Sequence, residues 1–187
     1  MTIKQLTLSF YCISMLSGCG IARNLASTLP IAPSISFRSI APLAGEYSNL
    51  GGNTPRGFRI QSQEELHDAL NSHLDEIPGM VDRKAYVDGL VSRLPVIDFT
   101  KDQGVLFLFG SQSSGGYEGK IAAIEEKSDR FVVHPILWTP SSGMTVTATV
   151  TYPYHYVAMP RSEKPMEFAP RVKREQPGPW YAISSVQ

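Results

Sequence analysis

The residues with the clearest chemical potential lie in a glycine-bearing segment that follows an apolar run. Gly110 and Gly115 have the spacing of a phosphate-binding loop, but that motif also requires Lys and then Ser or Thr after the second glycine. Gly116 and Tyr117 stand at those two positions. Because no side chain there can neutralise phosphate charge, we do not expect nucleotide binding.

Two serines in the same segment raise the question of nucleophilic catalysis. Ser113 and Ser114 follow a predicted strand. A nucleophilic serine needs a paired base and a third group that orients the base. The chain has no Gly-x-Ser-x-Gly motif, and no histidine lies near these serines in sequence. Turn formation accounts for them better, so we do not expect an enzyme.

The four histidines do not form a metal-binding pattern. Zinc sites need three or four ligands that converge on one point. No two histidines are four residues apart on a helix, and His67 and His73 fall on different faces of their predicted helix. The others, His134 and His155, lie on separate predicted strands. We therefore expect neither a metal nor a cofactor.

The composition limits the classes of partner. The chain has 187 residues, with 17 basic and 17 acidic side chains, so it has no long-range attraction for nucleic acid. Only 18% of its residues are charged, whereas 15 are glycine and 14 are proline. This mixture favours short strands and many turns over long helices.

The N-terminal segment reads as a secretory signal. Its apolar run, Leu6 to Leu16, is about ten residues long, too short for a membrane-spanning helix of about twenty. The alternative is a buried N-terminal helix or strand. Leu16-Ser17-Gly18-Cys19 resembles the lipobox of bacterial lipoproteins. That resemblance implies cleavage before Cys19 and attachment of lipid to its sulfur, with the membrane as a partner.

The lipobox resemblance also predicts where the protein works. Lipoproteins of this kind carry several acyl chains, which hold them stably in a membrane. Gly20 follows the cysteine, and the absence of Asp there favours the outer membrane over the inner one. We expect a lipid-anchored protein of the cell envelope that faces the periplasm or the exterior. The only other cysteine, Cys12, would leave with the signal peptide.

The chain divides into four predicted parts. Residues 1–18 form the signal peptide, and 19–35, with Pro30 and Pro33, form a flexible tether. A single globular domain spans 36–161. Residues 162–187 contain four prolines and a basic cluster, and this composition predicts a Pro-rich extended tail.

Helices are predicted only in the first half of the globular domain. Ser62 and Glu65 form a capping box, and leucine and alanine follow at helical spacing, which predicts a helix over about 63–74. A weaker helical stripe covers 80–94 and ends at Pro95. Both helices precede the main strands.

Strands dominate the second half. The apolar run Val105 to Phe109 lies between two glycines, as in a strand buried on both faces. Further strands are predicted over 117–124, 131–138, 145–151 and 154–159, where the alternation of Thr with Val or Ala makes 145–151 the most regular. The fold class is α+β, sheet-dominated, with an antiparallel β-sandwich or barrel-like sheet.

A second resemblance covers residues 95–161. Gly104 to Gly110 encloses the buried strand, Ser114-Gly115-Gly116-Tyr117 forms the turn, and Thr151 to Tyr154 contains a Pro-Tyr pair. This order resembles the C-terminal domain of the protease complex subunit PrcB family. Ser114 replaces that family's usual Thr, and the later turn, Pro140 to Gly143, is less regular.

The PrcB resemblance implies a lipoprotein module that associates with a protease or another envelope protein. Its binding residues would be those of the turn: Ser113, Ser114, Gly115, Gly116 and Tyr117. An alternative is a protease inhibitor that uses the same loop, because the Gly-Gly-Tyr sequence also resembles the Thr-Gly-Tyr loop of chagasin-like inhibitors. A further alternative is a structural envelope lipoprotein without catalytic activity.

Overall fold

The computed structural model describes residues 34–41, 52–74 and 82–176. The signal peptide, Cys19 and nearly all of the tether lie outside the described residues. The elements follow the chain in this order: β1 (Arg38–Ala41), β2 (Arg56–Ile60), α1 (Gln63–Leu74), α2 (Arg83–Val91), β3 (Asp102–Leu108), β4 (Glu118–Glu126), β5 (Phe131–Thr139), β6 (Tyr154–Pro160), β7 (Met166–Phe168) and β8 (Val172–Glu175).

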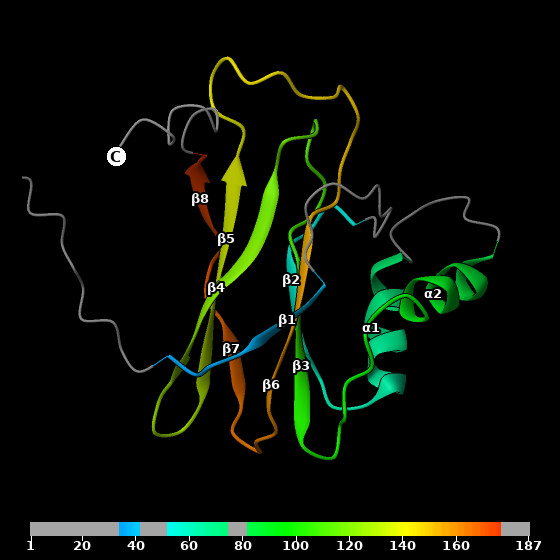
Figure 1. Cartoon of the computed structure of the whole chain (residues 1–187), viewed down its shortest axis with the longest axis vertical. Coiled ribbons are helices and arrows are strands. Elements are labelled where there is room, and N and C mark those ends of the chain that lie inside the picture. The colour runs from blue at the N-terminus through cyan, green and yellow to red at the C-terminus, as the bar shows by residue number, and fades with distance from the viewer. Residues whose placement is uncertain (1–33, 42–51, 75–81, 177–187) are drawn as a thin grey trace, which may run out of the picture. The chain divides into compact units, whose positions relative to one another are not determined.

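The strands form two sheets (Figure 1). The first has the order β1-β6-β3-β2 and is antiparallel throughout. In the second, β5 pairs with β4 in antiparallel fashion, and β7 and β8 pair with the other edge of β5 in parallel. The predicted α+β, sheet-dominated class is confirmed as an open two-sheet arrangement.

Strand β3 separates two hydrophobic cores because both of its faces are buried. Val105, Phe107 and the adjoining Phe109 pack against Ile121 and Leu137 of the second sheet. Leu106 and Leu108, on the opposite face, belong to the core beneath the helices. The continuous apolar run therefore has the predicted cause: β3 lies between a sheet and a helical layer.

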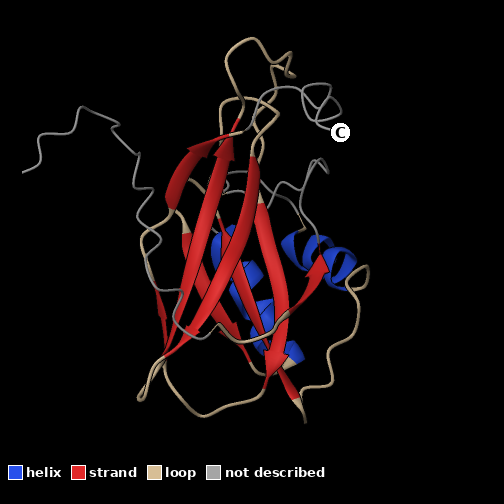
Figure 2. Cartoon of the chain, turned by 60° about the vertical axis from the view of Figure 1, so that its left-hand side comes forward, coloured by secondary structure: helices blue, strands red, loops and turns tan. Residues whose placement is uncertain are grey.

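The two helices cover the outer face of the first sheet (Figure 2). The predicted capping box of α1 is present, since the Glu65 N–H donates to Ser62 Oγ at 3.1 Å and Glu65 accepts from the Gln61 N–H at 2.6 Å. In α2, Asp82 caps the first turn by accepting from the Ala85 N–H at 2.9 Å. Leu66 and Leu70 of α1 and Val87 of α2 are buried in the core.

Residues 145–151 do not form the predicted strand. They are a largely exposed part of the loop between β5 and β6, and Val150 is 49% exposed. Only Thr151 pairs with another strand-like segment, through a single bridge to Gln112. Alternation of Thr and Val satisfies the strand pattern, but no neighbouring strand is available to bond the segment.

The second sheet continues past the predicted domain boundary at residue 161. The composition of 162–187 predicts a Pro-rich tail, yet β7 and β8 lie within this segment and pair with β5. Pro165 and Pro170 precede these strands, and the Pro165 carbonyl accepts from the Phe131 N–H at 2.9 Å. Proline is compatible with a strand at its start, where no N–H is needed. We call residues 162–176 the strap.

Pro135 accounts for the break between β7 and β8. The backbone groups of Val133 and Thr139 bond toward the strap, since they accept from the Ala169 and Gln176 N–H groups. Alternate residues of a strand bond to the same side, so Pro135 also faces the strap and has no N–H to give. Strand β4 has a register shift next to the Ile121↔Pro135 pair, so the extra residue lies in β4 and not in the strand that contains the proline.

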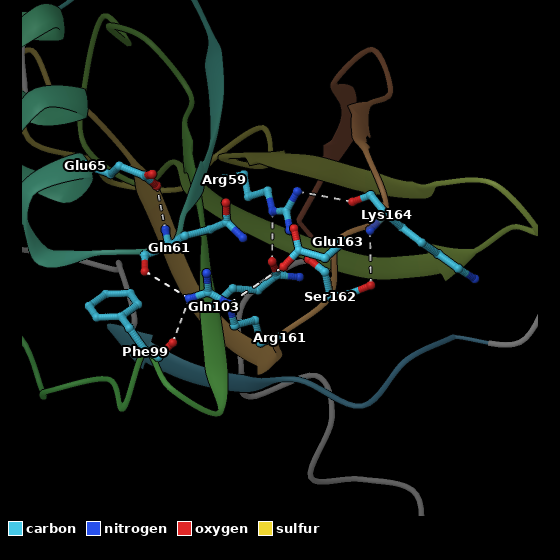
Figure 3. Close-up of polar contacts among 9 residues, drawn as sticks. All are labelled: Arg59, Gln61, Glu65, Phe99, Gln103, Arg161, Ser162, Glu163 and Lys164. Atoms are coloured by element: carbon cyan, nitrogen blue, oxygen red, sulfur yellow. Dashed lines mark hydrogen bonds and ion pairs between the residues drawn. The ribbon is translucent and has the colours of Figure 1, made fainter.

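A polar network fastens the strap to the first sheet (Figure 3). The Arg59 guanidinium donates to Gln103 Oε1 at 2.8 Å, to the Lys164 carbonyl at 3.3 Å and to the Ser162 carbonyl. Gln103 is fully buried. At the same end, Arg161 donates to the Phe99 carbonyl at 2.8 Å. The guanidinium groups of Arg59 and Arg161 thus donate to oxygen atoms of the protein itself, and this network holds the fold together.

None of the helices in the described part of the chain combines the length and the apolar character that crossing a membrane requires.

Candidate functional site

The predicted binding loop joins β3 to β4 and lies beside the loop that joins β5 to β6. Gln112 and Thr151 exchange two backbone hydrogen bonds of 2.8 and 3.0 Å, and the Gly115 N–H donates to the Thr147 carbonyl at 2.9 Å. Thr151 Oγ1 also donates to the Ser114 carbonyl at 2.8 Å. We call residues 111–117 and 140–151 together the apex.

The two glycines of the loop are required by internal packing. Gly116 has φ +79°, a conformation that glycine adopts without steric cost, and a Cβ there would lie 2.6 Å from Val146 Cγ1. A Cβ on Gly115 would overlap Thr147 Oγ1. Each glycine therefore allows one apex loop to pack against the other. The glycines are explained by this packing and not by a loop that projects alone into solvent.

The strap fixes both ends of the candidate loop. Arg171 Nη1 donates to the carbonyl of Phe109, just before the loop, and Gln176 Nε2 donates to the carbonyl of Gly116 at 2.7 Å. Gln112 is buried, and its side-chain amide donates to the Gly110 carbonyl at 3.1 Å. The loop is thus a preorganised surface feature, and its conformation depends on residues beyond the predicted domain boundary.

The five predicted binding residues differ in accessibility. Ser113 is exposed, whereas Ser114, Gly115 and Gly116 are half-buried. Tyr117 is also half-buried and packs against the core between the two sheets. Ser114 Oγ donates to the Gly115 carbonyl at 3.1 Å, the hydrogen bonding expected of a turn. Of the five, Ser113 is the most available to a partner.

Exposed apolar side chains lie in the apex beside the candidate loop. Met144 is 39% exposed and Val150 is 49% exposed. The apex thus carries these two accessible apolar side chains and the exposed Ser113 on a backbone that hydrogen bonds hold in place.

Within the part of the chain that the structure describes, no base is placed beside the serines of the candidate loop. His155 is directed elsewhere, His134 lies 3.4 Å from Glu125, and His67 lies 3.3 Å from Asp88. Among the residues that the structure describes, no three or more His, Cys, Asp or Glu side chains are grouped as metal ligands would be. The side chain of His73 lies outside what the structure describes.

His155 is a structurally important residue that sequence reasoning classed only as a non-ligand. It is 5% exposed, its Nδ1 accepts from the Ile121 N–H at 2.9 Å, and its Nε2 lies 3.1 Å from Ser39 Oγ. Because Nδ1 accepts, the ring proton is on Nε2, which donates to Ser39. His155 thereby links β6 to β1 and to β4, across the two sheets.

Burial and a nearby cation keep His155 neutral. Loss of solvation, together with the positive charge of Lys120, lowers the pKa of His155 to about 4. Protonation would also remove the acceptor for the Ile121 N–H. No short-range motif reveals this arrangement, because its partners are 34 and 116 residues away in sequence.

Comparison with known proteins gives a match for the segment that contains the apex. Residues 105–160, from within β3 to the end of β6, match the model of the family described as PrcB C-terminal. The chain therefore contains a PrcB-like domain, and the predicted resemblance over 95–161 is confirmed for this part. No curated protein and no solved structure gave a match.

Proposed function

We propose that the protein is a lipid-anchored binding module of the cell envelope that associates with a protease or another envelope protein through its apex. The match of residues 105–160 to the PrcB C-terminal family supports a role in a protease complex. The observation that carries the choice of surface is the exposure of Met144, Val150 and Ser113 on two loops that are hydrogen-bonded to each other. In this proposal the module is not itself an enzyme.

Membrane attachment in this proposal rests on the lipobox-like sequence that ends at Cys19. The lipid would be joined to the Cys19 sulfur and would display the domain on the outer membrane, toward the periplasm or the exterior. A Cys19→Ser variant is expected in the soluble fraction after cell lysis, while the parent chain sediments with membranes. If the variant still sediments in the presence of high salt, the anchor is not Cys19.

The apex proposal is tested by comparing two charge substitutions at equally exposed valines. Val150 is 49% exposed in the apex, and Val172 is 48% exposed on β8. The tagged parent chain, extracted from membranes, should co-purify a peptidase or another envelope protein, and Val150→Lys should reduce the recovery at least about tenfold. Val172→Lys should leave it unchanged. Equal recovery with both variants would contradict the apex assignment.

A protease inhibitor remains the second candidate function, acting through Ser113 to Tyr117. The internal packing of Gly115 and Gly116 weakens it, since these residues already contact Thr147 and Val146. Titration of papain-like and subtilisin-like proteases with the purified protein decides the question. Inhibition at micromolar concentration that Ser113→Trp abolishes would favour the inhibitor, and unchanged rates would remove it.

The third candidate function, a structural envelope lipoprotein of no catalytic activity, needs no specific protein partner. It predicts that Val150→Lys and Val172→Lys behave alike in the co-purification experiment. The same comparison therefore separates it from the first proposal.

A further inference from the structure

A cavity of about 160 Å³ lies between the helical layer and the first sheet. Its apolar walls come from α1, from the end of α2 and the segment that follows it, and from β6. They comprise Leu66, Val91, Leu94, Ile97, Phe99 and Tyr156. Figure 1 shows α1 and α2 side by side over this sheet.

The buried hydroxyl group of Tyr156 has no hydrogen-bond partner among the residues that the structure describes. Tyr156 is 1% exposed, and a Cβ built on Gly104 would lie 2.6 Å from its hydroxyl oxygen. The ring therefore extends from its own register position, opposite Leu106, toward the Gly104↔Ala158 pair. Phe99 and Ile97 precede β3 at that end of the sheet, and Tyr156 lines the same cavity as they do.

Burying a hydroxyl group without a partner is unfavourable, so native structures nearly always satisfy such groups. Burial also raises the pKa of Tyr156 well above its usual value. The hydroxyl is therefore protonated at all physiological pH values and can donate. A group that occupies the cavity and accepts one hydrogen bond would remove this cost.

The chemistry of the walls restricts what can enter. All of the residues that line the cavity are uncharged, and the polar ones are Gln63 and Ser92 in addition to Tyr156. A charged ligand would lose its hydration without gaining a counter-ion. Ser92 is also the C-cap of α2, and the negative end of the helix dipole there disfavours an anion.

The size of the cavity and its access route indicate a small molecule. An engineered apolar cavity of about 150 Å³ is large enough to bind benzene. Pro95 and Val96 line this cavity and are exposed, Val96 to 88%, so one wall adjoins solvent. We propose that this cavity binds a small neutral molecule with an apolar body and one acceptor oxygen, to which the Tyr156 hydroxyl donates. This site is separate from the apex and does not depend on the proposed function.

The test uses two ligands with the same number of heavy atoms. Acetophenone has an acceptor oxygen and cumene has none. We expect shifts of the methyl signals of Leu66, Leu94 and Ile97 in carbon–proton NMR spectra of the full chain on addition of either ligand. Acetophenone should bind about tenfold more tightly than cumene, the factor that one net hydrogen bond supplies.

Three variants make the test specific. Tyr156→Phe should reduce the affinity for acetophenone to that for cumene and leave cumene unaffected. Tyr154→Phe is the matched control, because Tyr154 does not line this cavity, and it should change neither affinity. Val91→Phe should block both ligands by filling the space, and unchanged methyl spectra without ligand will verify that each variant is folded.

Two results would overturn the proposal. One is the absence of shifts at these three residues for both ligands up to their solubility limits. The other is an affinity for acetophenone that Tyr156→Phe does not change, which would mean that the hydroxyl takes no part in binding.

Discussion

At the scale of single residues, His155 is the group that connects the two sheets. It serves as an acceptor for a backbone N–H of β4 and as a donor to a side chain of β1, while it belongs to β6. Both neighbouring strands have register shifts close to these contacts, at Ser39/Ala41 and Ile121/Ala123. In β4 the irregular pairing accompanies a backbone N–H, that of Ile121, which the His155 side chain satisfies.

The first prediction concerns the pH dependence of stability. The pKa of His155 is lowered to about 4 in the folded protein from an ordinary value of 6.5. The unfolded chain therefore binds more protons between these values, and stability is complete above pH 6.5 and falls as the pH drops toward 4. The expected loss from this group is about 3 kcal/mol. Urea unfolding at pH 7.0, 5.5 and 4.5 measures it.

His155→Asn provides the comparison for this pH effect. The Asn side chain can still accept from the Ile121 N–H but does not titrate. The variant should be less stable at pH 7, by about 1–2 kcal/mol for the lost contact with Ser39, and should lose less stability on acidification than the parent. Parallel pH profiles for the two proteins would show that His155 does not titrate as described.

The second prediction concerns the close packing in the apex. Gly116 and Gly143 both have positive φ, +79° and +86°, but a Cβ on Gly116 would meet neighbours within 4 Å, whereas a Cβ on Gly143 would meet none. Gly143→Ala should cost about 1 kcal/mol from backbone conformation alone. Gly116→Ala should cost about 2–4 kcal/mol, because it also forces Val146 and Pro140 apart. Urea unfolding of both variants measures the difference, and equal costs would mean that the apex loops do not pack closely.

The sequence predicts single residues well where the signal is local. The capping box at Ser62 and Glu65 forms as expected because its partners are three residues apart. The roles of His155 and Arg59 could not be predicted, since their partners lie 34 to 116 residues away and depend on how the sheets meet. The glycines of the apex stand out in the sequence, but packing against a distant loop, rather than ligand access, explains them.

At the scale of elements, the strap is the feature that completes the second sheet. Phe168 of β7 fills the space left by Gly57, where a Cβ would overlap its ring, and its ring centroid is 6.0 Å from that of Phe107. Arg59 donates hydrogen bonds to the carbonyls of Ser162 and Lys164, which precede β7. Arg171 and Gln176 donate to carbonyls at the two ends of the apex loop. The strap thus connects the first sheet, the second sheet and the apex.

The third prediction follows from these contacts. A chain that stops after Arg161 loses the partial burial of Phe168, for which full burial would be worth about 1.5–3 kcal/mol. It also loses the Ser162 and Lys164 carbonyls that accept from Arg59, at about 1–3 kcal/mol for hydrogen bonds to a charged group. Together with the open edge of β5, these losses approach the whole stability of a typical domain. We expect no cooperative thermal transition by circular dichroism. A chain that stops after Gln176 should unfold cooperatively, and similar curves for the two would contradict the role of the strap.

The two elements that differ from the sequence prediction have one explanation. Strand formation depends on a neighbouring strand more than on composition. Thr145 to Thr151 has the right alternation but only one bridge, whereas the strap is rich in proline and yet lies beside the bonding edge of β5. A strand that is buried on both faces, such as β3, is predicted correctly because its continuous apolar sequence follows from burial alone.

At the scale of the whole molecule, the apex and the end near Arg59 differ in what their polar and apolar groups contact. The apex combines Met144, Val150 and the exposed Ser113 on loops that are fixed by hydrogen bonds. The end near Arg59 and Arg161 is occupied by the network that holds the strap (Figure 3). A rigid, partly apolar loop surface loses little conformational entropy on binding, which favours the apex as the contact for a partner.

The most direct test of the central claim is site-specific photo-crosslinking in cells that make the protein with its own N-terminal segment. A photoreactive side chain at Ser113 should form an adduct with a peptidase or another envelope protein, identified by mass spectrometry, and Val150→Lys should suppress it. The same side chain at Val172, exposed but outside the apex, should form no such adduct. Adducts of equal yield at both positions, or none at Ser113, would contradict the assignment of the apex as a binding surface.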